Sequence, residues 1–204
     1  MARNPRQNER MRDERRQAIL ACAVRLFATR GLAATKVADI AAAVVMSQGL
    51  LYHYFRSKEE IFVEIVRQAF ERMNTAARDL ERLPLTPRQK VEQAAATLMR
   101  TLEEHENFSW ISVLISTASI SDAVPAEARA IIRRERDVPY RVVARLARAG
   151  QRDGSFDDGR PDDLALIFWT TVKGLALHRL AFGSAYRSPD PRILTRIFFS
   201  ETPT

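Results

Sequence analysis

The stretch that decides the fold runs from Thr35 to Lys58 and reads TKVADIAAAVVMSQGLLYHYFRSK. Val37, Ile40 and Ala41 recur at helical spacing and form a narrow apolar stripe. Thr35 suits the N-cap of this helix, because its hydroxyl can accept a hydrogen bond from a backbone N–H of the first turn. The pattern therefore predicts a short helix over about residues 36–43.

A second short helix is predicted over about residues 47–54. Ser47 offers an N-cap shortly after the first helix ends, and Leu51 and Phe55 lie four residues apart on one helical face. A third helix is predicted to begin at Ser57, where a Ser-x-x-Glu capping box precedes an apolar run.

Two short helices joined by a tight turn form a helix-turn-helix unit, whose second helix lies in the major groove of DNA. The second helix here leaves Gln48, Tyr52 and His53 free to point outward, and such side chains can bond phosphates and base edges. An ordinary helical hairpin with a polar face would show the same pattern, because such hairpins are common in all-α proteins. The pattern alone leaves both interpretations open.

The stretch also resembles the signature of the TetR/AcrR family of transcriptional regulators. The resemblance is carried by Thr35, Ile40-Ala41, Ser47, Gly49, Leu51-Tyr52-His53-Tyr54-Phe55 and Ser57-Lys58-Glu59-Glu60. It implies an all-α protein with a DNA-binding head over residues 1–56, in which the helices cover about 13–29, 36–43 and 47–54. Residues 57–204 would then form a helical body for ligand binding and dimerisation.

The resemblance also implies roles for individual residues of the head. Thr35, Tyr52, His53 and Lys58 match positions that usually touch the DNA backbone, whereas Gln48 and Leu50 match positions that usually face bases. The predicted DNA-binding residues are Thr35, Lys36, Ser47, Gln48, Gly49, Leu50, Tyr52, His53 and Lys58.

Two residues depart from the family pattern. The family commonly has Thr where this chain has Leu50, and usually has Gly in the turn where this chain has Val45. A β-branched residue at positive φ is strained, so either Val45 is strained or the turn is built differently. We predict the second, with Val45 at negative φ and its side chain in the small core of the head.

Composition and charge agree with a DNA partner. The chain has 46% apolar and 28% charged residues and only 7 glycines among 204 residues, which favours a globular helical protein. Residues 1–58 hold 11 of the 32 Lys and Arg residues but only 4 of the 25 Asp and Glu residues, so the net charge of +7 lies in this part. This is the distribution expected for a polyanion partner. A basic membrane-surface helix is the rival interpretation, but its apolar face would be Ala-rich and without Trp.

Residues 1–12 allow two interpretations. They are either a solubilising tail or an arm that contacts DNA.

The cysteine content indicates the compartment of the protein. Cys22 is the one cysteine, so an intramolecular disulfide is excluded and the chain fits a reducing compartment. No signal peptide and no uncharged apolar run of membrane-spanning length is present. We therefore expect a cytoplasmic protein with no membrane partner.

The body is predicted to bind a small, largely apolar or aromatic effector. Six side chains could line its pocket: Met99, Phe108, Trp110, Tyr140, Trp169 and His178. Aromatic residues and Met at helical spacing are also common in plain cores. The body could instead bind a protein partner or no ligand.

The last two long apolar segments predict a homodimer, because a helix that is apolar on most sides must be buried by something. The predicted interface comprises Leu164, Phe168, Leu175, Phe182, Leu194 and Phe198. Completion of the core of the monomer is the alternative. A helix-turn-helix protein that reads a palindromic operator favours the dimer, because its two heads must bind two half-sites.

No catalytic, metal or cofactor motif is found. His53, His105 and His178 lie far apart in the sequence, and the acidic residues around His105 lack a second His or a Cys to complete a metal site. The sequence thus predicts a TetR-like regulator, a repressor released by its effector, with no cofactor. A small all-α enzyme remains a remote alternative.

Overall fold

The computed structural model describes residues 5–199. Every regular element among these residues is a helix, which confirms the predicted all-α fold. The elements are α1 (Pro5–Ala34), α2 (Val37–Ala43), α3 (Gln48–Tyr52), α4 (Lys58–Arg82), α5 (Pro87–Glu104), α6 (Glu106–Ala118), α7 (Ala126–Glu135), α8 (Val138–Arg152), α9 (Pro161–Phe182), the 3₁₀ turn η1 (Gly183–Ala185) and α10 (Pro191–Thr195).

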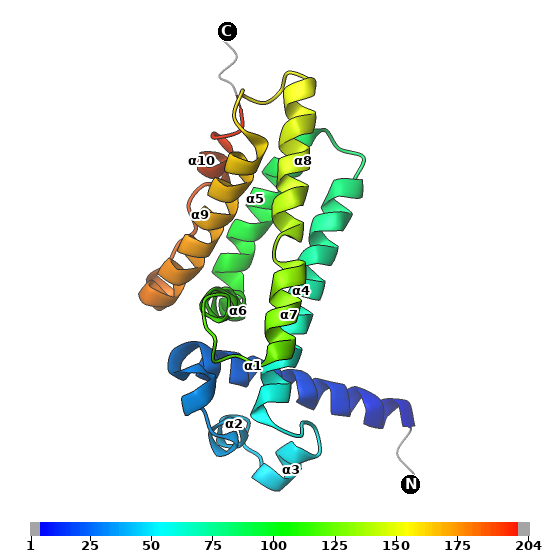
Figure 1. Ribbon diagram of the computed structural model, residues 1–204, viewed down its shortest axis with the longest axis vertical. Helices are drawn as coiled ribbons and strands as arrows, with labels where there is room; N and C mark the ends of the chain where they lie inside the picture. The colour runs from blue at the N-terminus through cyan, green and yellow to red at the C-terminus, as the bar shows by residue number, and fades with distance from the viewer. Residues whose placement is uncertain (1–4, 200–204) are drawn as a thin grey trace.

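The helices form an elongated molecule with a head at one end (Figure 1). Helices α2 and α3 lie at the tip, and α1 crosses between them and the rest of the chain. Helix α4 leaves the head and runs along the body beside α8, while α5 and α9 follow the same long axis. Helix α4 therefore joins the head to the body, as expected for the segment that begins at Ser57.

Helix α1 is longer than the sequence predicted. It begins at Pro5 rather than near residue 13, so the described part of the polar N-terminal segment is helical rather than a tail. The backbone of α1 leaves helical geometry at Gly31, which has φ 77° and ψ 162°, a conformation that glycine adopts without steric cost. Arg3, which we placed in a possible DNA arm, lies outside the described residues.

Local chemistry also marks the ends of the body helices. Thr86 and Gln89 form a reciprocal capping box at the start of α5, with N–H···O distances of 3.2 and 3.0 Å. Pro139 lies in the first turn of α8, which begins at Val138, shortly after α7 ends at Glu135. Asp190 caps α10 by accepting a hydrogen bond from the Arg192 N–H.

Two clusters of buried apolar side chains stabilise the molecule. The first joins α1–α4 to α6 and α7, and it includes Phe27, Phe62 and Phe70. The second lies among α5, α8, α9 and α10, and it includes Phe168 and Phe198. The first cluster extends beyond the head, because α4, α6 and α7 all contribute to it. The division of the chain at residue 57 stays a prediction about function.

Two helices are long and apolar enough to cross a membrane by length and composition alone, over Glu9–Ala34 and Pro161–Ala185. Helix α1 uses its apolar face inside the protein, where Ile19, Ala23 and Phe27 are almost fully buried. A buried core helix can have the same length and apolar composition as a membrane span. Helix α9 buries one side in the second core and leaves apolar side chains exposed on the other.

Candidate nucleic-acid interface

Helices α2 and α3 are packed on the first core by short apolar stripes. Ile40 and Ala41 of α2 are buried, as are Leu51 of α3 and Phe55 just after it. Ser47 caps α3, because its hydroxyl accepts a hydrogen bond from the Leu50 N–H at 3.2 Å. The two predicted helices and the Ser47 cap are therefore confirmed, although α3 ends at Tyr52 rather than at residue 54.

The turn between the two helices contradicts our prediction for Val45. Val45 has φ 53°, the one non-Gly residue with positive φ in the described chain, and its side chain is 93% exposed. The Val45 N–H donates to the Ala42 carbonyl and the Met46 N–H donates to the Ala41 carbonyl, at 3.1 and 3.0 Å. This pair of bonds is the Schellman motif, which requires the left-handed conformation at the residue after the C-cap. The turn thus keeps the usual geometry, and Val45 rather than the backbone path bears the strain.

Replacement of Val45 by Gly should stabilise the protein. Glycine adopts positive φ without steric cost, whereas an L-residue there costs roughly 1–2 kcal/mol and a β-branched one is an outlier. Part of that gain is lost to the greater freedom of glycine in the unfolded chain, so we expect a melting temperature about 2 °C higher and unchanged DNA affinity.

The matched control is Val44→Gly at the neighbouring position. Val44 has φ −103° and packs partly against the first core, so this variant should melt at a lower temperature than the wild type. A lower melting temperature for Val45→Gly would show that Val45 is not strained. Differential scanning calorimetry of both variants makes the comparison.

Thr35 does not serve as the predicted N-cap. Its side chain is buried, and its hydroxyl donates to the carbonyls of Gly31 and Leu26 at 2.8 and 3.4 Å. Lys36 occupies the N-cap position instead, and its backbone N–H donates to the Asp39 carboxylate at 2.9 Å. Spacing alone could not show this, because the positive φ of Gly31 turns the chain and brings Thr35 back against the end of α1. The Thr35 hydroxyl is thus oriented toward the protein.

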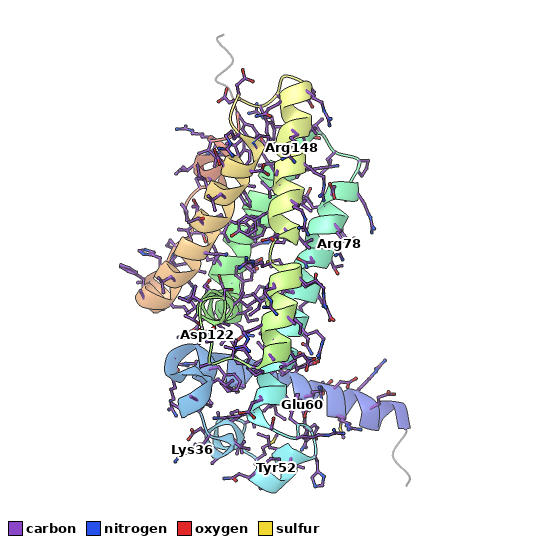
Figure 2. All side chains as sticks on the ribbon, viewed as in Figure 1. Lys36, Tyr52, Glu60, Arg78, Asp122 and Arg148 are labelled. Carbon is purple, nitrogen blue, oxygen red and sulfur yellow. The ribbon has the colours of Figure 1, made fainter. Side chains whose placement is uncertain are left out.

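Most of the other predicted DNA-binding residues share one surface. Figure 2 shows Lys36 and Tyr52 at the tip of the head. A shallow depression of about 460 Å³ lies there and is lined by Thr35, Lys36, Val37, Ala38, Gln48, Tyr52, Arg56, Ser57, Lys58 and Glu59. The exposed residues of the predicted set are Lys36, Ser47, Gln48, Gly49, Tyr52 and His53. Leu50 is half-buried, which leaves less of its side chain for a base contact.

Arg56 is a basic residue of this depression that the sequence analysis missed. Its backbone N–H donates to the Glu60 carboxylate at 2.6 Å, while its side chain is exposed. The Ser57 hydroxyl accepts from the Glu60 N–H at 3.2 Å, which confirms the predicted cap of α4. The signal for Arg56 was its place in the basic segment directly before this cap, where backbone N–H groups also favour an anion.

Lys58 also lines the depression, but its ammonium group is turned toward the protein. Its Nζ donates to the backbone carbonyls of Leu32, Ala33 and Thr35 at 2.8, 3.0 and 2.9 Å. The ammonium group therefore does not face the solvent, where the phosphate contact expected of Lys58 would be made.

The six side chains predicted to line an effector pocket are not all brought together. Met99 and Trp169 are buried in the second core and Phe108 and Tyr140 pack against it, with the Tyr140 and Trp169 ring centroids 6.1 Å apart. Trp110 instead packs against the first core, and its Nε1 donates to Glu106 at 3.0 Å. His178 is exposed and its ring lies 4.1 Å from that of Phe182. Trp110 therefore belongs to a different cluster from Met99 and Trp169, while His178 lies at the exposed edge of the second core, with its ring 6.0 Å from that of the buried Tyr186.

The predicted dimer interface also needs correction. Four of its residues are buried in the protomer itself: Leu164, Phe168, Leu194 and Phe198. Leu175 is half-buried, and Phe182 is 56% exposed. The exposed apolar face of α9 carries Leu166, Ile167 and Leu177, which are 54%, 48% and 59% exposed. The error arose because a helix that is apolar on most sides does not reveal which side meets its own chain.

Comparisons with known proteins agree with this geometry. Residues 19–65 match the family of bacterial regulatory proteins called the tetR family. The chain is also similar to the HTH-type transcriptional repressor KstR2 of Rhodococcus jostii, with 33% identity over 165 residues that cover 78% of each chain.

Solved structures share the fold. The ketosteroid transcriptional regulator KstR2 of Mycobacterium tuberculosis aligns with a TM-score of 0.71 and 21% identity, over 92% of this chain and 96% of that one. A transcriptional regulator from Saccharomonospora viridis in complex with choline aligns with a TM-score of 0.67 and 24% identity, over 93% and 100% of the two chains. On the helix-turn-helix geometry and these similarities, the chain belongs to the tetR family and is a DNA-binding transcriptional regulator rather than an enzyme.

Proposed function

We propose that this regulator represses transcription by binding as a homodimer to a palindromic operator in the cytoplasm, and that a small, largely apolar effector releases it. The proposal rests chiefly on the exposed polar surface at the tip of the head, in the part of the chain that carries the net positive charge. Helix N-termini and Lys or Arg side chains at such a surface bind phosphates, while the exposed positions of α3 can reach base edges.

The two kinds of contact should separate by mutation. Gln48 is exposed at the first position of α3 and can form paired hydrogen bonds with a base, so Gln48→Ala should change the preferred operator sequence. His53 is exposed at the end of α3, and His53→Ala should weaken binding to all sequences alike. Selection of bound sequences from a random DNA library, followed by affinity measurements, distinguishes the two results. A Gln48→Ala variant with unchanged preference would contradict the assigned base contact.

The exposed face of α9 supports the proposed homodimer. Leu166, Ile167 and Leu177 lie on this face together with the small residues Thr170 and Gly174. An exposed apolar stripe on a helix whose opposite side is core marks an interaction surface. A second copy is the occupant that we propose, because two heads related by a two-fold axis match two operator half-sites.

Three buried polar atoms support an effector site in the body. The Asn74 Oδ1 on α4, the Ser109 Oγ on α6 and the Trp169 Nε1 on α9 have no hydrogen-bond partner among the described residues. Asn74 itself is held by the Glu135 carboxylate, which accepts from its Nδ2 at 2.9 Å. A hydrogen bond from Arg134 lowers the pKa of Glu135 below its ordinary value, so this carboxylate stays ionised at neutral pH. A buried polar group without a partner costs about 1–3 kcal/mol, which a bound molecule with a few polar atoms would offset.

The buried side chains of this chain indicate the chemistry of the effector better than the ligands of its structural neighbours do. The choline of one structural neighbour and the ketosteroid in the name of another differ in charge and size. Here the walls would be apolar and aromatic, while Trp169 can only donate a hydrogen bond and Ser109 can donate or accept one. We therefore propose an uncharged apolar or aromatic molecule with at least one acceptor oxygen.

Tryptophan fluorescence tests the effector proposal. The chain has two Trp residues, so a Trp110→Phe variant reports on Trp169 alone. A true effector should change the Trp169 fluorescence, raise the melting temperature of the free protein and release it from DNA. Compounds that release DNA without changing the Trp169 signal would contradict the site. If neither ligands nor purified cell extracts release DNA, the alternative of a body that binds a protein or nothing gains support.

A further inference from the structure

Lys58 stands out because every hydrogen of its ammonium group is engaged within the protein. It is the first residue of α4, and its Nζ donates to the carbonyls of Leu32, Ala33 and Thr35 at 2.8, 3.0 and 2.9 Å. An ammonium group has three donors and no acceptor, so these bonds use its full capacity. A bond to a DNA phosphate would require at least one of them to break.

The three carbonyls lie where the backbone needs a partner. The last carbonyls of a helix have no intrahelical donor, and cations near them are favoured by the helix dipole. The backbone leaves helical geometry at Gly31, and the carbonyls of residues 32, 33 and 35 follow directly before α2 begins at Val37. The buried Thr35 hydroxyl bonds the Gly31 carbonyl in the same junction. Lys58 therefore joins the end of α1, the start of α2 and the start of α4.

We propose that Lys58 is a positioning residue for DNA recognition rather than a phosphate contact. By fixing the α1–α2 junction to the first turn of α4, it sets the place of α2 and α3 relative to the helix that enters the body. The phosphate contacts of this surface are then left to Lys36 and Arg56, whose side chains are exposed. The proposal replaces the role that the family resemblance implied for Lys58.

The chemistry of the two basic side chains provides a discriminating variant. Arg is an equal or better partner for phosphate than Lys, so Lys58→Arg should preserve a phosphate contact. A planar guanidinium cannot replace a compact ammonium among three converging carbonyls, so the same variant should disrupt the junction. The net charge is unchanged, which keeps the long-range attraction to DNA constant.

The test compares Lys58→Arg with Lys90→Arg as the matched control, because Lys90 lies in the body and its Nζ donates to one backbone carbonyl, that of Glu81, at 2.6 Å. We expect Lys58→Arg to bind DNA about tenfold more weakly and to melt at a lower temperature without DNA, the effect of losing charge-assisted hydrogen bonds. Lys90→Arg should keep the wild-type DNA affinity, because Lys90 lies on α5, outside the DNA-binding surface. A Lys58→Arg variant with wild-type affinity and melting temperature would overturn the proposal.

A second measurement uses the wild-type protein, so it does not depend on the folding of a variant. The chain has only four lysines, Lys36, Lys58, Lys90 and Lys173, and selective ¹⁵N labelling resolves their ammonium signals by NMR. The Lys58 signal should be visible in the free protein, because its hydrogens are protected from exchange, and should keep its position when DNA binds. A Lys58 signal that is absent from the free protein and appears, or shifts strongly, on DNA binding would instead assign it to a phosphate.

Discussion

Leu177→Glu should convert the protein from a dimer into a folded monomer. The Leu177 side chain is 59% exposed in the protomer, so its replacement removes little from the protomer core. In the proposed dimer it would be buried against the partner, where an unpaired carboxylate is strongly unfavourable. A cost of at least about 3 kcal/mol weakens dimerisation by roughly two orders of magnitude.

Sedimentation at micromolar concentration measures this effect directly. The variant should sediment as a monomer, retain the wild-type helical content and lose most of its affinity for a palindromic site, because one head then binds one half-site. Ile120→Glu is the matched control, since Ile120 is 88% exposed in the α6–α7 connection and is not part of the exposed face of α9. That control should remain a dimer. A wild-type protein that is itself monomeric under these conditions would refute the proposed assembly.

Phe198→Glu should have a different result, namely loss of the folded protomer. Phe198 is fully buried, and its ring lies 5.6 Å from that of Phe156 and 5.9 Å from that of Phe168. Removal of such a ring costs about 3–5 kcal/mol before the burial of a charge is added, out of a typical stability of 5–15 kcal/mol. The sequence pattern had assigned Phe198 to the dimer interface, where a charge would only have separated the protomers.

Circular dichroism during heating distinguishes these outcomes. Phe198→Glu should show no cooperative transition, or a melting temperature at least about 8 °C below the wild type. Ile193→Glu changes an exposed residue of α10, the helix that ends at Thr195 shortly before Phe198, and should preserve the fold of the protomer. A Phe198→Glu protein that is a stable monomer with wild-type melting behaviour would return Phe198 to the interface.

The sequence predicts the helices well where local chemistry determines them. The caps at Ser47, Ser57 and Thr86 mark true helix starts, because each depends on a hydroxyl and an N–H three residues apart. Thr35 carries the same type of hydroxyl but fails as a cap. Its bond partners depend on the path of the chain at Gly31, which residue spacing does not describe.

The sequence predicts the candidate sites less completely, because burial is a property of the whole fold. The partners of Lys58 lie more than twenty residues earlier in the chain, so they appear only once α1 and α4 are placed together. The exposed side of α9 and the separation of Trp110 from Trp169 likewise depend on how the body helices pack. Val45 is a different case, because the turn imposes a positive φ that a β-branched residue disfavours.

The dependence of DNA affinity on salt tests DNA recognition by the basic head most directly. Each phosphate contact releases counterions and contributes about 0.9 to the slope of log affinity against log salt concentration. Fluorescence anisotropy with a labelled duplex should therefore give a straight line that falls steeply from low to physiological salt. When Lys36 is replaced by Ala, the slope should become shallower by about 0.9, which is the contribution of one phosphate contact. An affinity that stays flat over this range would contradict DNA binding through the head.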